Sequence, residues 1–212
     1  MAEGLSLRNL VVRKGAEELV RIDAHVAAGS VLTLMGPSGA GKSSLLSAII
    51  GALPSGLTSD GEVWLNSKNI TGLAPERRRI GLLFQDDLLF PHMSVAGNLA
   101  FGLAAGGSRT ERAAKIAEAL EQVGLAGFGD RDPATLSGGQ RARVALMRTL
   151  LSQPRALLLD EPFSRLDSGL KDQTRQLVFG LIRSKGLPTV LVTHDPQDAK
   201  AAGGTVIDLG QK

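Results

Sequence analysis

Cysteine and tyrosine are absent from this sequence, and only 3% of its residues are aromatic. Without cysteine, disulfides and thiolate metal sites are excluded, which suits a reducing compartment. Apolar runs such as 156–159 and 190–192 have the length of strands, far below the ~20 residues that cross a bilayer. The start, residues 1–4, has no basic segment leading into an apolar one, so we expect no secretion.

Basic stripes interleaved with aromatics are also missing, and the formal net charge is only +3. We therefore expect no nucleic-acid partner, and we expect any membrane connection to come through another protein. A chain of 212 residues is long enough for one sizeable α/β core with a helical insertion, and too short for two domains of ordinary size.

The most informative stretch is Gly36-Pro37-Ser38-Gly39-Ala40-Gly41-Lys42-Ser43, which fits the phosphate-binding loop pattern without a gap. An apolar strand precedes it, and a helix from Ser44 to Ile50 follows. Backbone N–H groups and the helix N-terminus would hold a polyphosphate, with Lys42 at the β/γ-phosphates and Ser43 on Mg²⁺. A simple glycine-rich turn before a helix is disfavoured, because all fixed positions are filled in the right context.

Spaced apolar residues at 5–10 and 19–26 predict a leading β-hairpin, and 62–66 predicts a strand that joins its sheet. The segment 51–61, rich in Gly, Ser and Pro, is expected to be a loop. Three consecutive arginines at 77–79 could form a patch for a polyanion, but a solvated turn before the next strand is the interpretation we favour.

Polar residues follow three buried-strand patterns at the point where each ends. Gln85 follows 80–84, Asp160 and Glu161 follow 156–159, and His194 follows 189–193. Open parallel sheets place their ligands at this edge. Two adjacent carboxylates there indicate a cation or a reacting water. A helix cap is the structural alternative for the pair, and a lone histidine is usually structural.

Helical periodicity dominates from about residue 86 to 154, with a candidate capping box at Ser108 and Glu111. Within this helical insertion, Leu136-Ser137-Gly138-Gly139-Gln140 precedes a helix expected over 141–150. Backbone donors at that helix N-terminus predict a second anion site.

Together these motifs, with Ser164-Arg165-Leu166-Asp167, resemble the full motif set of ABC transporter ATP-binding subunits. The run 83–95 resembles the importer branch that serves polyamines, thiamine, iron or sulfate, and most of all the small bacterial YnjD-like group. The resemblance implies one ABC ATPase domain over 1–212. Residues 1–85 and 155–212 would form the RecA-like, mostly parallel core with an N-terminal antiparallel β subdomain, and 86–154 the helical signature subdomain.

The family's roles carry over residue by residue. Asp160 would hold Mg²⁺ through water, together with Ser43 and Gln85, and Glu161 would be the general base that polarises the attacking water. His194 would contact the γ-phosphate, and Gln85 would touch both the metal shell and the transporter. The implied nucleotide-binding set is Gly36, Pro37, Ser38, Gly39, Ala40, Gly41, Lys42, Ser43, Ser44, Ser137, Gly138, Gly139, Gln140 and Asp167.

The resemblance further implies a head-to-tail homodimer in which each signature caps the ATP of the other subunit. It implies integral membrane permease subunits as partners, indirectly a solute-binding protein, and a cytoplasmic location at the inner face of the cell membrane. The cofactors would be ATP and Mg²⁺. With no extension after Lys212, we expect no built-in cargo-sensing domain.

Two residues depart from the family pattern. Lys14 stands where the family usually places an aromatic that stacks on adenine, which predicts weak base selectivity. Arg165 replaces a common small residue, and the sequence leaves its effect on the hydrolysis rate open.

Three alternatives to an importer subunit are an ABC protein of another kind, a phosphate-loop kinase and an exporter subunit. ABC proteins of DNA repair or translation usually carry coiled coils or a second cassette, and this chain has neither. A phosphate-loop kinase would have no use for the signature pentapeptide. Export instead of import stays open, because the membrane subunits mainly set the direction.

Overall fold

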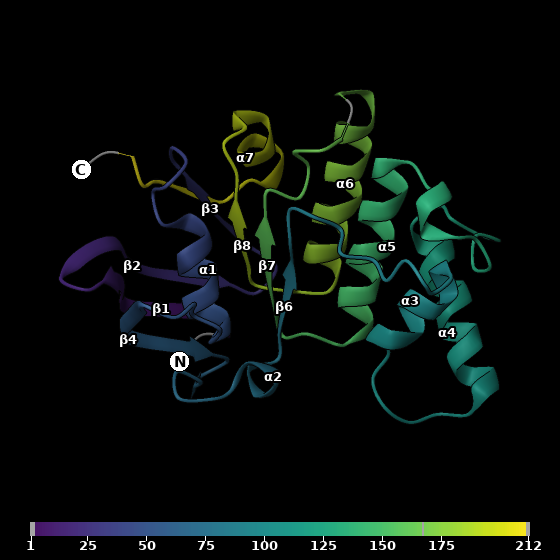
Figure 1. Ribbon diagram of the computed structural model, residues 1–212, viewed down its shortest axis with the longest axis horizontal. Coiled ribbons are helices and arrows are strands. Elements are labelled where there is room, and N and C mark those ends of the chain that lie inside the picture. Colours follow the sequence, from purple (N-terminus) through teal and green to yellow (C-terminus); the bar gives the residue numbers. More distant parts are fainter. Residues whose placement is uncertain (1–2, 167, 211–212) are drawn as a thin grey trace. The chain divides into compact units, whose positions relative to one another are not determined.

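The computed structural model describes residues 3–166 and 168–210 (Figure 1). The chain divides into two compact units. The first comprises Met1–Leu82, Arg155–Glu161 and Phe179–Lys212, and the second comprises Leu83–Pro154 and Pro162–Val178.

An antiparallel sheet of the first unit is built on the N-terminal hairpin, in the order β2-β1-β4-β5. As predicted, β1 (Gly4–Lys14) and β2 (Glu17–Ala27) pair across a short turn. The loop expected over 51–61 is wrong in its second half, because β4 spans Leu57–Leu65. Its first residues pair with the end of β1, and this pairing outweighs the local Gly and Ser content. The short β5 (Lys68–Asn69) completes the sheet.

The second sheet of this unit has the order β6-β7-β8-β3-β9. Strand β3 pairs in parallel with β8 and β9, and β7 pairs in parallel with β8. The carboxyl ends of these paired strands therefore share one edge, where a ligand site is expected. The bounds are β3 Val31–Met35, β6 Ile80–Leu83, β7 Ala156–Asp160, β8 Thr189–Val192 and β9 Thr205–Asp208.

Helix α1 (Lys42–Ile50) shares one hydrophobic core with both sheets of the first unit. Its Leu45 and Ile49 are fully buried, as are Leu34 of β3 and Leu158 of β7. Because the core locks the helix against β3 and β7, the loop at its N-terminus is held close to the strand ends. Two shorter helices, α2 (Pro75–Arg78) and α7 (Pro196–Ala202), also belong to this unit.

Helices make up most of the second unit: α3 (Val95–Gly102), α4 (Arg109–Gln122), the 3-10 turn η1 (Pro133–Thr135) and α5 (Gly138–Leu151). Helix α6 (Ser168–Ser184) begins in this unit and ends in the first. The capping box that starts α4 is confirmed. No helix in the described part of the chain is both long and apolar enough to span a bilayer.

The arginine run at 77–79 is only partly the solvated turn that was expected. Arg78 is buried, with 6% of its surface exposed. Its guanidinium donates to the carbonyls of Ala48 and Ile49, and to two more carbonyls in the segment 71–73. The last turn of a helix leaves carbonyls without partners, so Arg78 caps the C-terminal end of α1.

Trp64, the single tryptophan of the chain, lies on β4 and is half-buried. Its indole N–H donates to Glu62 at 2.7 Å, and the guanidinium of Arg8 lies 4.5 Å from the ring centre. All three residues belong to the antiparallel sheet of the first unit.

Candidate active site

The phosphate-binding loop has the backbone geometry that its glycines predict. Gly39 and Gly41 adopt the left-handed region, with φ of 86° and 79°, which a side chain would strain. Gly41 is the N-cap of α1, and no side chain caps this helix end. The first N–H groups of α1 are therefore available to an anion, and the helix dipole favours negative charge there.

Lys42 lies across the mouth of the loop. Its Nζ donates to the carbonyls of Gly36 and Pro37, both at 2.8 Å, and only 8% of the residue is exposed. A lysine ammonium has three donors. Lys42 is thus an anchored cation at the place where phosphate oxygens would enter.

Ser43 and Asp160 meet at the strand edge. The Ser43 hydroxyl lies close enough to the Asp160 carboxylate to favour its charged form. Burial raises the pKa of the Asp160 carboxyl above its ordinary value, and the neighbouring Glu161 adds to the rise, while Ser43 and Lys42 oppose it. A half-buried carboxylate whose charge is disfavoured in this way is stabilised by a cation.

Glu161 and His194 also come together, from the ends of adjacent strands β7 and β8. Glu161 Oε1 lies 3.2 Å from His194 Nδ1. Glu161 has a positive φ of 46°, uncommon for a residue with a side chain, and its N–H is fixed by the carbonyl of Val192 at 2.9 Å. Strain of this kind persists only where the surroundings hold it, and it is frequent at active sites.

The segment around His194 is held on both sides. The hydroxyl of Thr193 donates to the buried carboxylate of Asp198 at 2.6 Å and accepts from the N–H of Asp195 at 3.1 Å. Asp195 in turn caps α7 by accepting from the N–H of Gln197. The backbone of His194 is therefore positioned, while 64% of its side chain stays exposed.

A hollow of about 320 Å³ borders the phosphate-binding loop at Ala40. Four consecutive residues of β2 line one side of it, and Ile207 and Asp208 of β9 line another together with the following Leu209. Leu19 is the unpaired residue of a bulge in β2, between the pairs that Val20 and Glu18 make with β1. Bulges re-aim side chains and are frequent beside active sites. The sequence showed no signal for this hollow beyond the strand patterns, and Lys14 is not among the residues that line it.

In the second unit, Gln85 and the following aspartates are tied to the loop after β7. The Gln85 amide lies 3.5 Å from the hydroxyl of Ser164, and Asp86 forms an ion pair with Arg165. Arg141, in the first turn of α5, lies 3.4 Å from Asp87. Burial raises the pKa of the Asp87 carboxyl, and the Arg141 guanidinium opposes this rise.

The signature segment forms the N-terminus of α5. Ser137 is the N-cap: its hydroxyl accepts from the N–H of Gln140 at 3.3 Å, and the Gln140 side chain accepts from the N–H of Ser137 at 2.9 Å. The helix expected from Arg141 thus starts earlier, at Gly138. Gly139 is buried, and a Cβ there would contact Leu170 of α6.

The structure therefore brings Lys42, Ser43 and Asp160 into one site with Glu161 and His194 nearby in the first unit, whereas Gln85 and the signature belong to the second. Asp167 lies outside the described residues. Within those residues, no cluster of three or more His, Asp or Glu side chains is arranged to hold a metal. A metal at Ser43 and Asp160 would take one hydroxyl and one carboxylate from the protein.

Comparison with known proteins gives concordant matches. A family model described as ABC transporter matches residues 19–164. YnjD of Escherichia coli (strain K12), described as an uncharacterized ABC transporter ATP-binding protein, is 50% identical over 208 residues, which cover 98% of this chain and 95% of YnjD. The thiamine import ATP-binding protein ThiQ of Cereibacter sphaeroides is 43% identical over 201 residues, which cover 92% of this chain and 84% of ThiQ.

Solved structures match as well. The dimeric structure of MJ0796, described as a bacterial ABC transporter cassette, matches with a TM-score of 0.80 and 30% identity. The match covers 97% of this chain and 94% of the MJ0796 chain. A second dimeric structure of MJ0796, in a post-hydrolysis state bound to ADP and Pi, has a TM-score of 0.80 and 31% identity, with the same coverage.

Proposed function

The chain belongs to the ABC transporter family as an ATP-binding, ATP-hydrolysing subunit, and from this premise we propose how its residues use ATP to drive solute transport. The observation that carries the proposal is the convergence of Lys42, Ser43 and Asp160 beside the contact between Glu161 and His194. Phosphoryl transfer needs charge neutralisation and an aligned water more than covalent chemistry, and these residue types supply both.

The phosphates of ATP would lie against the uncapped N-terminus of α1. When ATP binds, the Lys42 ammonium would exchange its hydrogen bonds to the carbonyls of Gly36 and Pro37 for bonds to the β/γ-phosphates. Its present bonds already hold the ammonium where these phosphates would enter. Gly39 and Gly41 adopt the left-handed backbone that this loop needs, and a Cβ on Gly41 would also approach Val20 of β2 at 3.1 Å. The rest of the nucleotide would extend toward the hollow beside Ala40.

Ser43 and Asp160 fit Mg²⁺, which prefers oxygen ligands and keeps several waters. The Ser43 hydroxyl lies close enough to favour the charged form of Asp160, so both oxygens are near the place where the metal would bind. Bound Mg²⁺ would neutralise charge on the phosphates. Gln85 would also touch the metal shell, as the family resemblance implies.

Glu161 would act as the general base. Its carboxylate can accept a proton from the attacking water, and its contact with His194 Nδ1 fixes its orientation. With Nδ1 engaged, the other ring nitrogen of His194 is the one available to the γ-phosphate. The anchored segment from Thr193 to Asp195 would keep the imidazole in place through the cycle.

We extend the proposal to a head-to-tail homodimer in which Ser137, Gly138 and Gly139 cap the ATP of the other subunit. A hydroxyl can accept and donate at once, so Ser137 can cap α5 and still donate its O–H to a phosphate. Asp167 would cross the interface. ATP binding would then close the dimer, and hydrolysis would loosen it.

The membrane partner would be a pair of permease subunits that docks on the second unit, served in turn by a solute-binding protein. Phe84, Leu88 and Phe101 are large apolar residues of this unit that are about half exposed or more. Exposed apolar side chains of this size favour a protein contact. The subunit would then lie at the inner face of the cell membrane.

Size-exclusion chromatography of Glu161→Gln with Mg-ATP tests the proposal. Because this variant would bind ATP without a working base, we expect a stable dimer that wild type shows only transiently. Lys42→Ala should remain monomeric, since it loses the contacts with the phosphates. Glu17→Gln, an exposed carboxylate in the first hairpin, is the matched control and should behave as wild type.

Three outcomes would contradict the mechanism. A monomeric Glu161→Gln that binds ATP with wild-type affinity would argue against ATP shared between two copies. Full ATPase activity in Glu161→Gln would show that Glu161 is not the base. Retention of ATP binding in Lys42→Ala would remove the assigned role of that lysine.

A further inference from the structure

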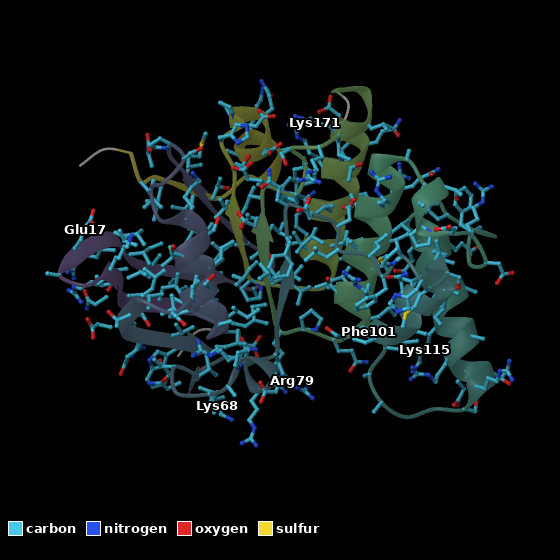
Figure 2. All side chains as sticks on the ribbon, viewed as in Figure 1. Glu17, Lys68, Arg79, Phe101, Lys115 and Lys171 are labelled. Atoms are coloured by element: carbon cyan, nitrogen blue, oxygen red, sulfur yellow. The ribbon has the colours of Figure 1, made fainter. Side chains whose placement is uncertain are left out.

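A hollow of about 260 Å³ in the first unit is lined by cationic side chains and by no carboxylate. Lys68, Arg77, Arg79 and Arg155 surround it, with the buried Arg78 behind them. The other lining residues, Leu65, Ile70 and Leu73, are aliphatic. Figure 2 labels Lys68 and Arg79, which reach this hollow from the β4–β5 hairpin and from the end of α2.

Three separate segments bring these charges together. Lys68 follows a tight turn in which Asn66 and Ser67 both have positive φ, typical of a type I′ hairpin. Arg79 also has a positive φ, of 55°, which ends α2 and turns the chain into β6. Arg155, which precedes β7, is fixed beside it by a backbone hydrogen bond to Arg79 at 2.8 Å.

The hollow is separate from the nucleotide site. Arg79 and Arg155 precede β6 and β7, whereas Asp160 and Glu161 stand at or after the end of β7. A strand of this length rises about 3.3 Å per residue, so the two sites are on the order of 15 Å apart. A phosphate at one site does not occupy the other.

Arg78 differs from the other four cations. Its guanidinium is committed to four backbone carbonyls, and burial lowers its pKa. Lys68, Arg77, Arg79 and Arg155 make no ion pair within residues 3–166 and 168–210, and all are exposed. Like charges held around one hollow repel each other, and an anion between them would relieve this repulsion.

From this arrangement we propose that the hollow is a binding site for a phosphate-bearing anion, separate from the ATP site. Arginine and lysine side chains are well suited to phosphate oxygens, because a guanidinium can bind two of them at once. The aliphatic floor favours a ligand with a small apolar part next to its phosphate. The phosphate could belong to a soluble metabolite or to a lipid headgroup, since both present the same oxygens.

Isothermal titration with pyrophosphate in metal-free buffer tests the site. The titrated protein carries Lys42→Ala, which removes the main phosphate contact of the ATP site. We expect measurable binding that weakens at least tenfold when Arg79→Gln and Arg155→Gln are added. Both side chains are exposed, so these changes should leave the melting temperature nearly unchanged.

Arg109→Gln with Lys115→Gln is the matched control, because it removes two exposed cations from α4 in the second unit. It lowers the net charge equally and should change the affinity less than twofold. The proposal is overturned if the two double variants weaken binding equally, which would mean nonspecific charge attraction. It is also overturned if no binding is detected at millimolar pyrophosphate.

Vesicle flotation separates the two sources of phosphate. If the ligand is a lipid headgroup, the Lys42→Ala protein should float with vesicles containing phosphatidylglycerol, not with pure phosphatidylcholine vesicles, and the Arg79 and Arg155 changes should abolish this. If pyrophosphate binds and neither vesicle does, the ligand is a soluble anion. If the protein binds vesicles equally well with and without the Arg79 and Arg155 changes, the vesicles do not bind at this hollow.

Discussion

Lys14 stands at the turn where ABC subunits usually place an adenine-stacking aromatic, and the hollow beside the phosphate-binding loop is lined without any aromatic side chain. Its apolar contacts come from aliphatic residues such as Leu19, Val20 and Leu209. Loss of a base–aromatic stack is worth on the order of 1–3 kcal/mol, by analogy with nucleic-acid sites.

We therefore predict that ATP and GTP bind with dissociation constants within about tenfold of each other. Equilibrium titration with fluorescent analogues of both nucleotides, each competed with the unlabelled form, measures this. Lys42→Ala is the control, because it should weaken both nucleotides alike. ATP binding more than tenfold tighter than GTP binding would show that another group reads the base.

The sequence indicated which polar side chains gather at the sheet edge, because each follows a strand and parallel strand ends share an edge. It thereby placed Glu161 and His194 at the same edge, where the structure finds them in contact. It could not indicate that Arg78 is buried, because its partners lie about 30 positions earlier, at the end of α1. The same holds for the hollow at Ala40, which the first hairpin and the last strand form together.

Among the elements, α1 depends on a distant residue at its C-terminal end. Gly41 starts it without a side-chain cap, and Arg78 caps its last turn. Replacing this arginine removes donors from four backbone carbonyls, of which that of Ala48 still accepts a hydrogen bond from the N–H of Gly51. The cost is about 1–3 kcal/mol for each unpaired carbonyl that water does not reach.

We predict that Arg78→Met lowers the melting temperature by about 6–12 °C, from a loss of roughly 3 kcal/mol at 2–4 °C per kcal/mol. Thermal unfolding followed by circular dichroism measures this. Arg109→Met, an exposed arginine at the start of α4, is the control and should shift it by less than about 2 °C. Equal shifts in the two variants would argue against capping by Arg78.

The segment after Gln85 is held by two arginines of different exposure. Arg165 and Asp86 are both more than half exposed, whereas Asp87 is 25% exposed beside Arg141. An exposed ion pair contributes less than about 1 kcal/mol to the free energy of unfolding. Removing the partner of a buried charge lowers this free energy more, because the remaining charge is left uncompensated.

Arg165→Ala is therefore expected to change the melting temperature by less than about 4 °C, and Arg141→Ala to lower it more. Arg141 also donates to the carbonyl of Leu136 at 2.7 Å, which its replacement would leave unpaired. Differential scanning calorimetry measures the melting temperatures of the two variants. A larger loss from Arg165→Ala would mean that its pair with Asp86 matters to the fold.

Helices and strands were largely predictable from apolar spacing, and the ABC ATPase fold expected from the motifs is confirmed by the likeness to MJ0796. The predicted start residues were wrong where hydrogen bonds to other residues determine them. Strand β4 begins within a stretch rich in Gly and Ser because β1 supplies its hydrogen bonds. Helix α5 begins at Gly138 because the capping box of Ser137 and Gln140 closes around two glycines.

For the molecule as a whole, nucleotide binding should appear as stability. A ligand that binds only the folded chain stabilises it by about 2.7 kcal/mol at 100 times its dissociation constant. Under those conditions we predict that Mg²⁺ with a non-hydrolysable ATP analogue raises the melting temperature of wild type by about 5–11 °C.

Differential scanning fluorimetry with an external dye measures this shift. Lys42→Ala is the control variant, and it should show no shift at the same concentration. A comparable rise in Lys42→Ala would place the stabilising contacts elsewhere. A rise with the analogue and EDTA equal to that with Mg²⁺ would show that the metal adds nothing to binding.

Trp64 makes the first unit optically distinct. Because the chain has no tyrosine and one tryptophan, its near-ultraviolet emission arises almost entirely from one indole in the antiparallel sheet. Far-ultraviolet ellipticity instead reports helices, which make up most of the second unit. Unfolding curves from the two signals coincide only if both units unfold cooperatively. A native chromophore thus reveals, without any label, whether the two units unfold together.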